Sequence, residues 1–110
     1  MSRIVSSSPP CDMFDVDVEV LSYVNKFVGG PGTGSVDVVE VGYPGDTVRT
    51  VLERLSERHA ALRKALWEGN QIGAHIEVVI NGAILGVHHT LDSELRPGDR
   101  ITLLGQYVGG

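Results

Sequence analysis

The stretch that decides the fold runs from Arg96 to Gly110 and reads RPGDRITLLGQYVGG. Its Pro97-Gly98-Asp99 segment is typical of a tight turn, because proline presets one backbone angle and glycine readily takes a positive φ. The apolar residues of 100–104, set beside Thr102, predict a strand. Residues 106–110 have no apolar period that would bury them, so the sequence predicts a flexible C-terminal tail.

The predicted tail finishes in two glycines, and this feature of the sequence indicates a chemical role. A Gly-Gly end is thin and takes backbone angles closed to other residues, so it can thread a narrow channel. It would present the α-carboxylate of Gly110, which has an ordinary pKa of about 3.3–3.7 and is a poor electrophile until it is activated. ATP can activate such a group as an acyl adenylate for attack by a sulfur or amine nucleophile. Tyr107, Val108, Gly109 and Gly110 are therefore candidate site residues.

Upstream of the turn, alternating apolar and polar residues predict further strands. Their expected ranges are 16–24, 36–41, 76–80 and 83–87. One helical stripe lies between the second and third of these strands, because its apolar residues fall at offsets that fit a 3.6-residue period. Its members are Val48, Val51, Leu52, Leu55, Leu62 and Leu66, with His59 in phase. Asp46 or Thr47 is the expected N-cap and Gly69 the expected end.

The connections carry turn signals rather than catalytic motifs. Gly29 to Gly34 lacks the Gly-Lys-Ser/Thr ending of a phosphate loop, so we interpret it as a flexible hairpin connection. Asn81-Gly82 predicts a two-residue hairpin turn. We interpret the polar segment 68–75 as a plain connection. Residues 90–95 are expected to form a loop or a short helical turn, with two apolar anchors at Leu91 and Leu95.

The ordered set of these motifs resembles the small ubiquitin-like sulfur carriers, which include the small subunit of molybdopterin synthase and the carriers of the thiamin and cysteine pathways. The strand Val78 to Gly82, the Pro97-Gly98-Asp99 turn and the Gly109-Gly110 end carry the resemblance, which covers about 16–110. The resemblance implies an α+β fold, the β-grasp, with a mixed sheet of four to five strands packed on one main helix. The molybdopterin-synthase type usually has Pro-Pro where Gly105-Gln106 stands here, which leaves the pathway open.

The resemblance also implies the chemistry and the partners. An E1-like adenylating enzyme would use ATP and Mg to adenylate Gly110, and a persulfide or sulfide would convert the adenylate to a thiocarboxylate. A synthase or sulfhydrolase partner would then accept the sulfur. The implied contact surface is the exposed sheet face near the last strand, with Leu103 or Leu104 at its centre and Arg96 and Arg100 on its rim. No cofactor bound by this chain itself is expected.

Composition limits the function classes. The chain has 110 residues, hydrophobic content of 42% and a net charge of −5, which fits one globular domain and argues against a nucleic-acid partner. A single cysteine, Cys11, favours a reducing, cytoplasmic location, and we interpret it as incidental. No run approaches a membrane span. Adjacent His88 and His89 would point to opposite faces of a strand, so no metal site is expected.

Three functions remain open from the sequence. The first is the sulfur carrier, without catalytic residues of its own, and the second is a ubiquitin-like protein tag joined to lysines through Gly110. The third is an interaction domain whose tail has no chemical role. The expected organisation is a flexible leader over 1–14, a β-grasp domain over 15–105 and the tail over 106–110.

Overall fold

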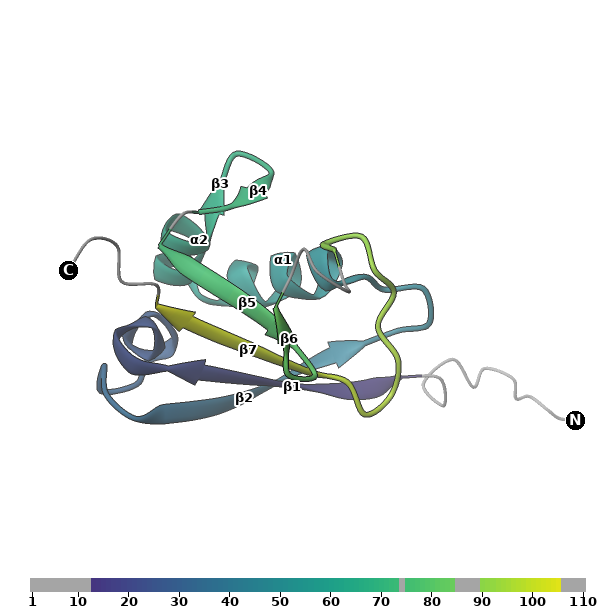
Figure 1. The fold of residues 1–110 in the computed structure, drawn as a ribbon, viewed down its shortest axis with the longest axis horizontal. Coiled ribbons are helices and arrows are strands. Elements are labelled where there is room, and N and C mark those ends of the chain that lie inside the picture. The colour runs from purple at the N-terminus through teal and green to yellow at the C-terminus, as the bar shows by residue number, and fades with distance from the viewer. Residues whose placement is uncertain (1–12, 74, 85–89, 106–110) are drawn as a thin grey trace, which may run out of the picture.

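The structure is a computed structural model that describes residues 13–73, 75–84 and 90–105 (Figure 1). Its main feature is a five-stranded sheet in the order β2-β1-β7-β5-β6. The strands are β1 (Phe14–Leu21), β2 (Ser35–Gly42), β5 (Ile76–Ile80), β6 (Ala83–Ile84) and β7 (Arg100–Gly105). β1 and β7 are parallel, and the other neighbours are antiparallel. The predicted α+β class and the mixed β-grasp sheet are confirmed.

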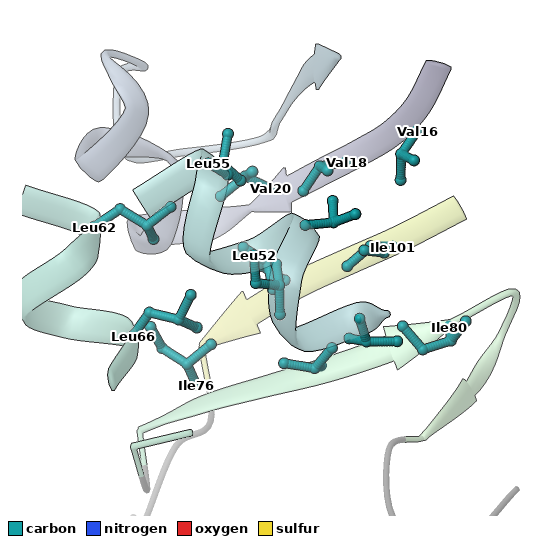
Figure 2. Packing of buried hydrophobic residues seen from close by; sticks show 14 of the residues in the cluster. Val16, Val18, Val20, Leu52, Leu55, Leu62, Leu66, Ile76, Ile80 and Ile101 are labelled. Atoms are coloured by element: carbon teal, nitrogen blue, oxygen red, sulfur yellow. The ribbon is translucent and has the colours of Figure 1, made fainter. Parts of the chain in front are cut away.

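Two helices, α1 (Val48–Arg58) and α2 (Ala60–Leu66), cover one face of the sheet (Figure 1). Their apolar stripe packs against the sheet residues that alternate toward the same side, such as Val18, Ile76 and Ile101 (Figure 2). All six stripe residues predicted from the sequence are fully buried. Burial of apolar surface at about 25 cal/mol per Å² is therefore the main stabilising contribution, and it fixes the sheet and helices as one unit.

The predicted single helix is interrupted at His59, where the backbone is extended (φ −133°, ψ 90°). The stripe stays in phase across the break, so the apolar pattern alone could not reveal it. A physical cause lies one turn earlier. The buried Ser56 hydroxyl donates a hydrogen bond to the Leu52 carbonyl (2.6 Å), a contact that bends helices. Trp67 Nε1 donates to the same hydroxyl (2.9 Å) and ties the end of α2 back to α1.

A 3-10 helix, η3 (Ser22–Val28), follows β1 where the first strand was predicted to continue to Val24, so that boundary was wrong. Val24 and Val28 are buried on its inner side. Fully buried Asn25 holds the glycine-rich loop after it: Asn25 Nδ2 donates to Thr33 O (2.9 Å), and Asn25 Oδ1 accepts from the Gly32 N–H (2.6 Å). The loop joins the antiparallel strands β1 and β2, so the hairpin connection is confirmed. Its predicted flexibility is wrong, because the Asn25 side chain holds it by these two hydrogen bonds.

The segment predicted as a plain polar connection contains a short hairpin, β3 (Trp67–Glu68) paired with β4 (Gln71–Ile72). Gly69 in its turn has a positive φ of 67°. Trp67 and Ile72 are opposite each other and pack against the core. The hairpin therefore extends the core beyond the end of α2 rather than forming a separate surface feature.

The start of α1 is fixed by a dense polar network. Thr47 is the N-cap, and it exchanges hydrogen bonds with Thr50 in a capping box. The Asp46 carboxylate accepts from the Tyr43 N–H (2.8 Å) and forms an ion pair with Arg54 (3.0 Å). Burial by itself would raise the pKa of Asp46, but the hydrogen bonds from Arg54, Tyr43 and Thr50 outweigh it and hold that pKa below its ordinary value.

Two arginines of α1 also cover the free edge of β2. Arg54 Nη1 donates to Val41 O (2.7 Å), and Arg58 Nη2 donates to Val39 O (3.2 Å). Arg58 Nη2 also lies 2.8 Å from Oε1 of the buried Glu40, an ion pair without good hydrogen-bond geometry. An edge strand offers unpaired carbonyls to other chains, and this pair of arginines occupies two of them.

Candidate functional site

β7, the strand that leads to the predicted tail, lies in the middle of the sheet. Leu103 pairs with Val20 of β1 on one side and with Val78 of β5 on the other. Both neighbours donate or accept backbone hydrogen bonds along its length, so the end of β7 has little freedom to shift. Whatever follows Gly105 therefore starts from a fixed point of the fold.

Two of the three sequence motifs that carry the resemblance contact each other at the start of β7. Asn81, at a positive φ of 51°, heads the predicted hairpin turn. Its Oδ1 accepts from the Arg100 N–H (2.8 Å), and its Nδ2 donates to Asp99 Oδ1 (2.9 Å). The Asn81-Gly82 turn is thus hydrogen-bonded to the end of the Pro97-Gly98-Asp99 turn, and these bonds fix where β7 begins.

The opposite end of β7 is braced by η3. The Tyr23 ring lies so close to Gly105 that a Cβ at that position would overlap its Cε1 and Cζ atoms. The Tyr23 hydroxyl donates to His75 O (3.0 Å), just before β5. Sequence reasoning missed this brace because it assigned Tyr23 to the end of a strand. The signal was the spacing of four between Tyr23 and Phe27 and between Val24 and Val28, which fits a helical turn.

The structure distinguishes the two leucines of β7 that the sequence left equivalent. Leu103 is fully buried among the core residues, so its side chain cannot reach a partner. Leu104 alternates to the other side and is half-buried on the outer face, the sheet face away from α1 and α2. Of the two candidates for the centre of a contact surface, Leu104 is the available one.

Leu104 belongs to an outer apolar patch, which we define as Val79, Ile84 and Leu104. Val79 pairs with Ile84 of β6 on one side and with Thr102 of β7 on the other. Leu104 is two residues beyond Thr102 and points to the same side, so all three residues of the patch share the outer face. Ile84 is 48% exposed. Apolar residues gathered on an exposed sheet face are typical of a protein contact.

The flank of this patch is charged, and Arg100 organises it. Arg100 Nη2 lies 3.5 Å from Glu19 Oε1 on β1 and 3.3 Å from Asp37 Oδ1 on β2. Asp17 pairs with Arg100 in the strand register. Arg100 is thus held within an acidic row, whereas Arg96 is exposed in the turn before β7. At about 3.3 Å per residue, the start of β7 is roughly 17 Å from its end at Gly105.

Other predicted residues have simpler positions. Tyr107, Val108, Gly109 and Gly110 lie outside the described residues, as do Cys11, His88 and His89. Within 13–73, 75–84 and 90–105, no group of three or more His, Cys, Asp or Glu residues could hold a metal ion. No helix in that part of the chain is long and apolar enough to cross a membrane.

Comparisons with known proteins identify the fold. No family model and no curated protein matches the sequence. Among solved structures, the small archaeal modifier protein 1 (SAMP1) of Methanosarcina acetivorans has a TM-score of 0.68 at 23% identity, over 89% of this chain and 98% of that one. A chain of the Amycolatopsis orientalis BexX/CysO complex has a TM-score of 0.65 at 25% identity, over 86% and 99%.

A putative molybdopterin converting factor, subunit 1, from Pyrococcus furiosus has a TM-score of 0.61 at 21% identity, over 86% of this chain and 99% of that one. The match therefore spans nearly the whole of each of these small proteins. The chain has the β-grasp fold of the ubiquitin-like sulfur carrier superfamily, as the motifs in its sequence indicated.

Proposed function

We propose that this protein is a sulfur carrier whose reacting group is the α-carboxylate of Gly110. The observation that carries the proposal is the position of β7. A central strand, braced at Gly105 by Tyr23, delivers the predicted Gly-Gly segment from a fixed point on the surface. A rigid base below a thin segment is what an external active site needs in order to receive a carboxylate in one geometry.

The chemistry would proceed in two balanced steps on a partner enzyme. In the first, a carboxylate oxygen of Gly110 attacks the α-phosphate of Mg-ATP, which forms the acyl adenylate and releases pyrophosphate. In the second, hydrosulfide attacks the acyl carbon, AMP leaves with the former carboxylate oxygen, and a proton is released. If the donor is a persulfide, the acyl disulfide first formed needs a thiol to free the thiocarboxylate. Neither step requires a side chain of this protein, because the only group it contributes is the α-carboxylate of Gly110.

The partner contact in this proposal is the outer apolar patch. Leu104 lies one residue before Gly105, so a protein that encloses the segment beyond Gly105 meets this side chain first. Protein contacts commonly place an apolar centre within a polar rim, which matches Val79, Ile84 and Leu104 beside the charged row of Glu19 and Arg100. One relative, CysO, was solved in a complex with BexX, which supports a role exercised with a partner protein.

A second function, the protein tag, has an observation of its own in its favour. SAMP1, a protein described as a modifier, is among the solved structures that match this chain. A tag would use the same adenylate but pass the acyl group to a lysine amine, with AMP as the leaving group and an amide as the product. The two functions therefore share the first step and differ in the nucleophile.

One experiment tests the proposal and separates it from the tag. The protein is incubated with its adenylating enzyme, Mg-ATP and sulfide, and its intact mass and pyrophosphate release are measured. A carrier gains the mass difference between one sulfur and one oxygen atom, and alkylation of the new thiocarboxylate shifts the mass again. A tag instead appears on larger conjugates when a protein substrate is added. Absence of adenylation in both cases would leave only the interaction-domain function.

A further inference from the structure

A groove of about 360 Å³ lies at the end of the molecule where β7 finishes. η3, α2 and the start of β5 gather there (Figure 1), and η3 contacts both α2 and β7. We call it the tail-base groove and define it by six of its lining residues. They are Tyr23, Phe27, Lys64, Trp67, Glu68 and His75.

The walls of the tail-base groove are mainly aromatic. Tyr23, Phe27 and Trp67 are each only partly buried, and each packs against the core from its rim. The indole N–H of Trp67 donates to Ser56, which does not line the groove. Glycine at position 73 adds backbone without a side chain. The groove thus offers ring faces to an occupant, and an apolar side chain suits them best.

The rim of the groove carries positive charge on a chain whose net charge is −5. Lys26 and Lys64 are the only lysines in the sequence, and Lys64 lines the groove. Lys26 is not a lining residue, but its Nζ lies 5.6 Å from the centre of the ring of Phe27, which is one. Glu68 is the acidic residue among the lining side chains. The lysine on the lining, Lys64, and the lysine beside Phe27, Lys26, thus stand near a groove whose lining has one acidic residue, and this balance of charge favours an occupant that carries a carboxylate.

The groove also adjoins the proposed reaction path. Tyr23 forms one wall of it and is the residue that braces Gly105. A partner that reaches the end of β7 would therefore meet the groove at Tyr23, close to Leu104. The outer apolar patch and the tail-base groove would be the two contacts on either side of the strand end.

We propose that the tail-base groove is a docking site for the activating enzyme, and that it accepts a surface segment with a bulky apolar side chain next to a carboxylate. The apolar group would lie against Phe27 and Trp67, and the carboxylate would pair with Lys64. The inference rests on the proposed function and deepens it, because it names the partner's chemistry at a second surface. Because the groove would hold the domain and not the reacting carboxylate, a change in the groove should alter KM and leave kcat unchanged.

The test compares two charge reversals on adjacent residues of α2. Lys64→Glu changes the groove, while Arg63→Glu makes the same change in charge at an exposed neighbour that lines a different surface hollow. Pyrophosphate exchange with the adenylating enzyme gives KM and kcat for the carrier. We expect Lys64→Glu to raise KM about fivefold or more with kcat unchanged, and Arg63→Glu to change KM less than twofold. Equal effects on KM would overturn the inference, because they would reflect general charge attraction.

The occupant of the groove is tested separately with Trp67, the only tryptophan. Its emission and its quenching by acrylamide are compared in the full chain and in a chain that lacks residues 106–110. Identical values are expected, because the occupant is the partner. A difference would mean that this chain's own terminal segment occupies the groove, which would overturn the docking inference.

The variant that lacks Gly110 distinguishes failure of the inference from failure of the proposed function. If that deletion abolishes adenylation while Lys64→Glu and Arg63→Glu behave alike, the carrier function stands and the groove inference fails. If the unaltered protein is not adenylated, both fail together.

Discussion

The ring of Tyr23 lies against the backbone of Gly105, so the last described residue of β7 is held by a residue that follows β1. β1 and β7 are parallel neighbours, and η3 turns back from β1 to place Tyr23 there. The contact joins distant parts of the sequence at the point from which the proposed reacting segment departs. Its consequence is that residue 105 must be glycine for the ring to stay in place.

Gly105→Ala should therefore destabilise the fold, because the new Cβ forces the Tyr23 ring or the strand to move. Overpacking of this kind costs about 1–3 kcal/mol. Urea denaturation of the single variants and of Tyr23→Ala/Gly105→Ala measures the coupling. Gly105→Ala should lower the free energy of unfolding by less in the Tyr23→Ala background than in the unaltered protein. Strictly additive effects of the two substitutions would show that the two residues do not interact.

Leu55→Ala tests the packing of the helical stripe. Leu55 is fully buried between α1 and the sheet, and such truncations cost about 2–5 kcal/mol. Ile84→Ala is the matched control, because Ile84 is 48% exposed and surface changes usually stay within about 0.5 kcal/mol. A denaturation midpoint unchanged by Leu55→Ala would contradict the packing shown in Figure 2.

The Asp46 network predicts how stability depends on pH. The folded-state pKa of Asp46 is lowered by its hydrogen bonds, so its contribution is fully present above the unfolded value of about 3.9. As pH falls below that value the unfolded state binds the proton first, and the contribution is lost by the time pH passes the folded pKa. The urea midpoint should drop more steeply below about pH 4 in the unaltered protein than in Asp46→Asn.

Asp92→Asn is the control for the loss of an ion pair at neutral pH. Asp92 contacts Arg49 at 3.2 Å, but its side chain is 77% exposed, whereas that of Asp46 is 12% exposed. Exposed ion pairs contribute about 0–1 kcal/mol to stability. Asp92→Asn should therefore lower the free energy of unfolding at pH 7 by less than Asp46→Asn does. The reverse order would mean that the polar network at the start of α1 is not stabilising.

The regular periods in the sequence were enough to predict most of the fold. The stripe that includes Leu52 and Leu55 is a helical period, and Ile76 to Ile80 is a strand period, so both elements were predicted at or near their observed positions. Asn81-Gly82 and Pro97-Gly98-Asp99 were predicted as turns from the residues that allow positive φ. These features are local, and local chemistry decides them.

The features that the sequence did not reveal depend on contacts between distant residues. The break at His59 follows from Ser56 and Trp67, and the assignment of Leu103 to the core follows from the strand order. Adjacent leucines carry no period that says which one points inward. The tail-base groove combines η3, α2 and β5, so its existence could not be predicted before the packing was known.

Leu104 should contribute to the proposed contact with the activating enzyme, because it is the apolar side chain nearest the strand end on the outer face. Leu104→Ser should raise KM for adenylation about tenfold, equivalent to about 1.4 kcal/mol, with kcat unchanged. Val39→Ser is the control, since Val39 is also exposed on the outer face but lies on the edge strand β2. Equal effects of the two variants would remove the outer apolar patch from the interface.

Arg96 and Arg100 were predicted on the rim, and charge reversal at both should weaken binding in a titration. Arg100→Glu would also bring a further acid beside Glu19 and Asp37, so some loss of stability is expected from that change alone. Arg96→Glu lies in an exposed turn and isolates the binding effect. If neither variant changes the affinity, the rim does not extend to the start of β7.

Gly110 should be required for adenylation because it supplies the reacting carboxylate. Deleting it moves the carboxylate back by one residue, which spans at most about 3.3–3.6 Å. Misplacement by about 1 Å can already cost on the order of 100-fold in rate. Gly109→Val should cause similar harm, because a β-branched side chain restricts the backbone and thickens the segment that must enter the enzyme. Both variants should keep the unaltered circular dichroism spectrum while pyrophosphate exchange and thiocarboxylate formation are lost. Normal activation of the protein without Gly110 would refute the carrier function and favour an interaction domain.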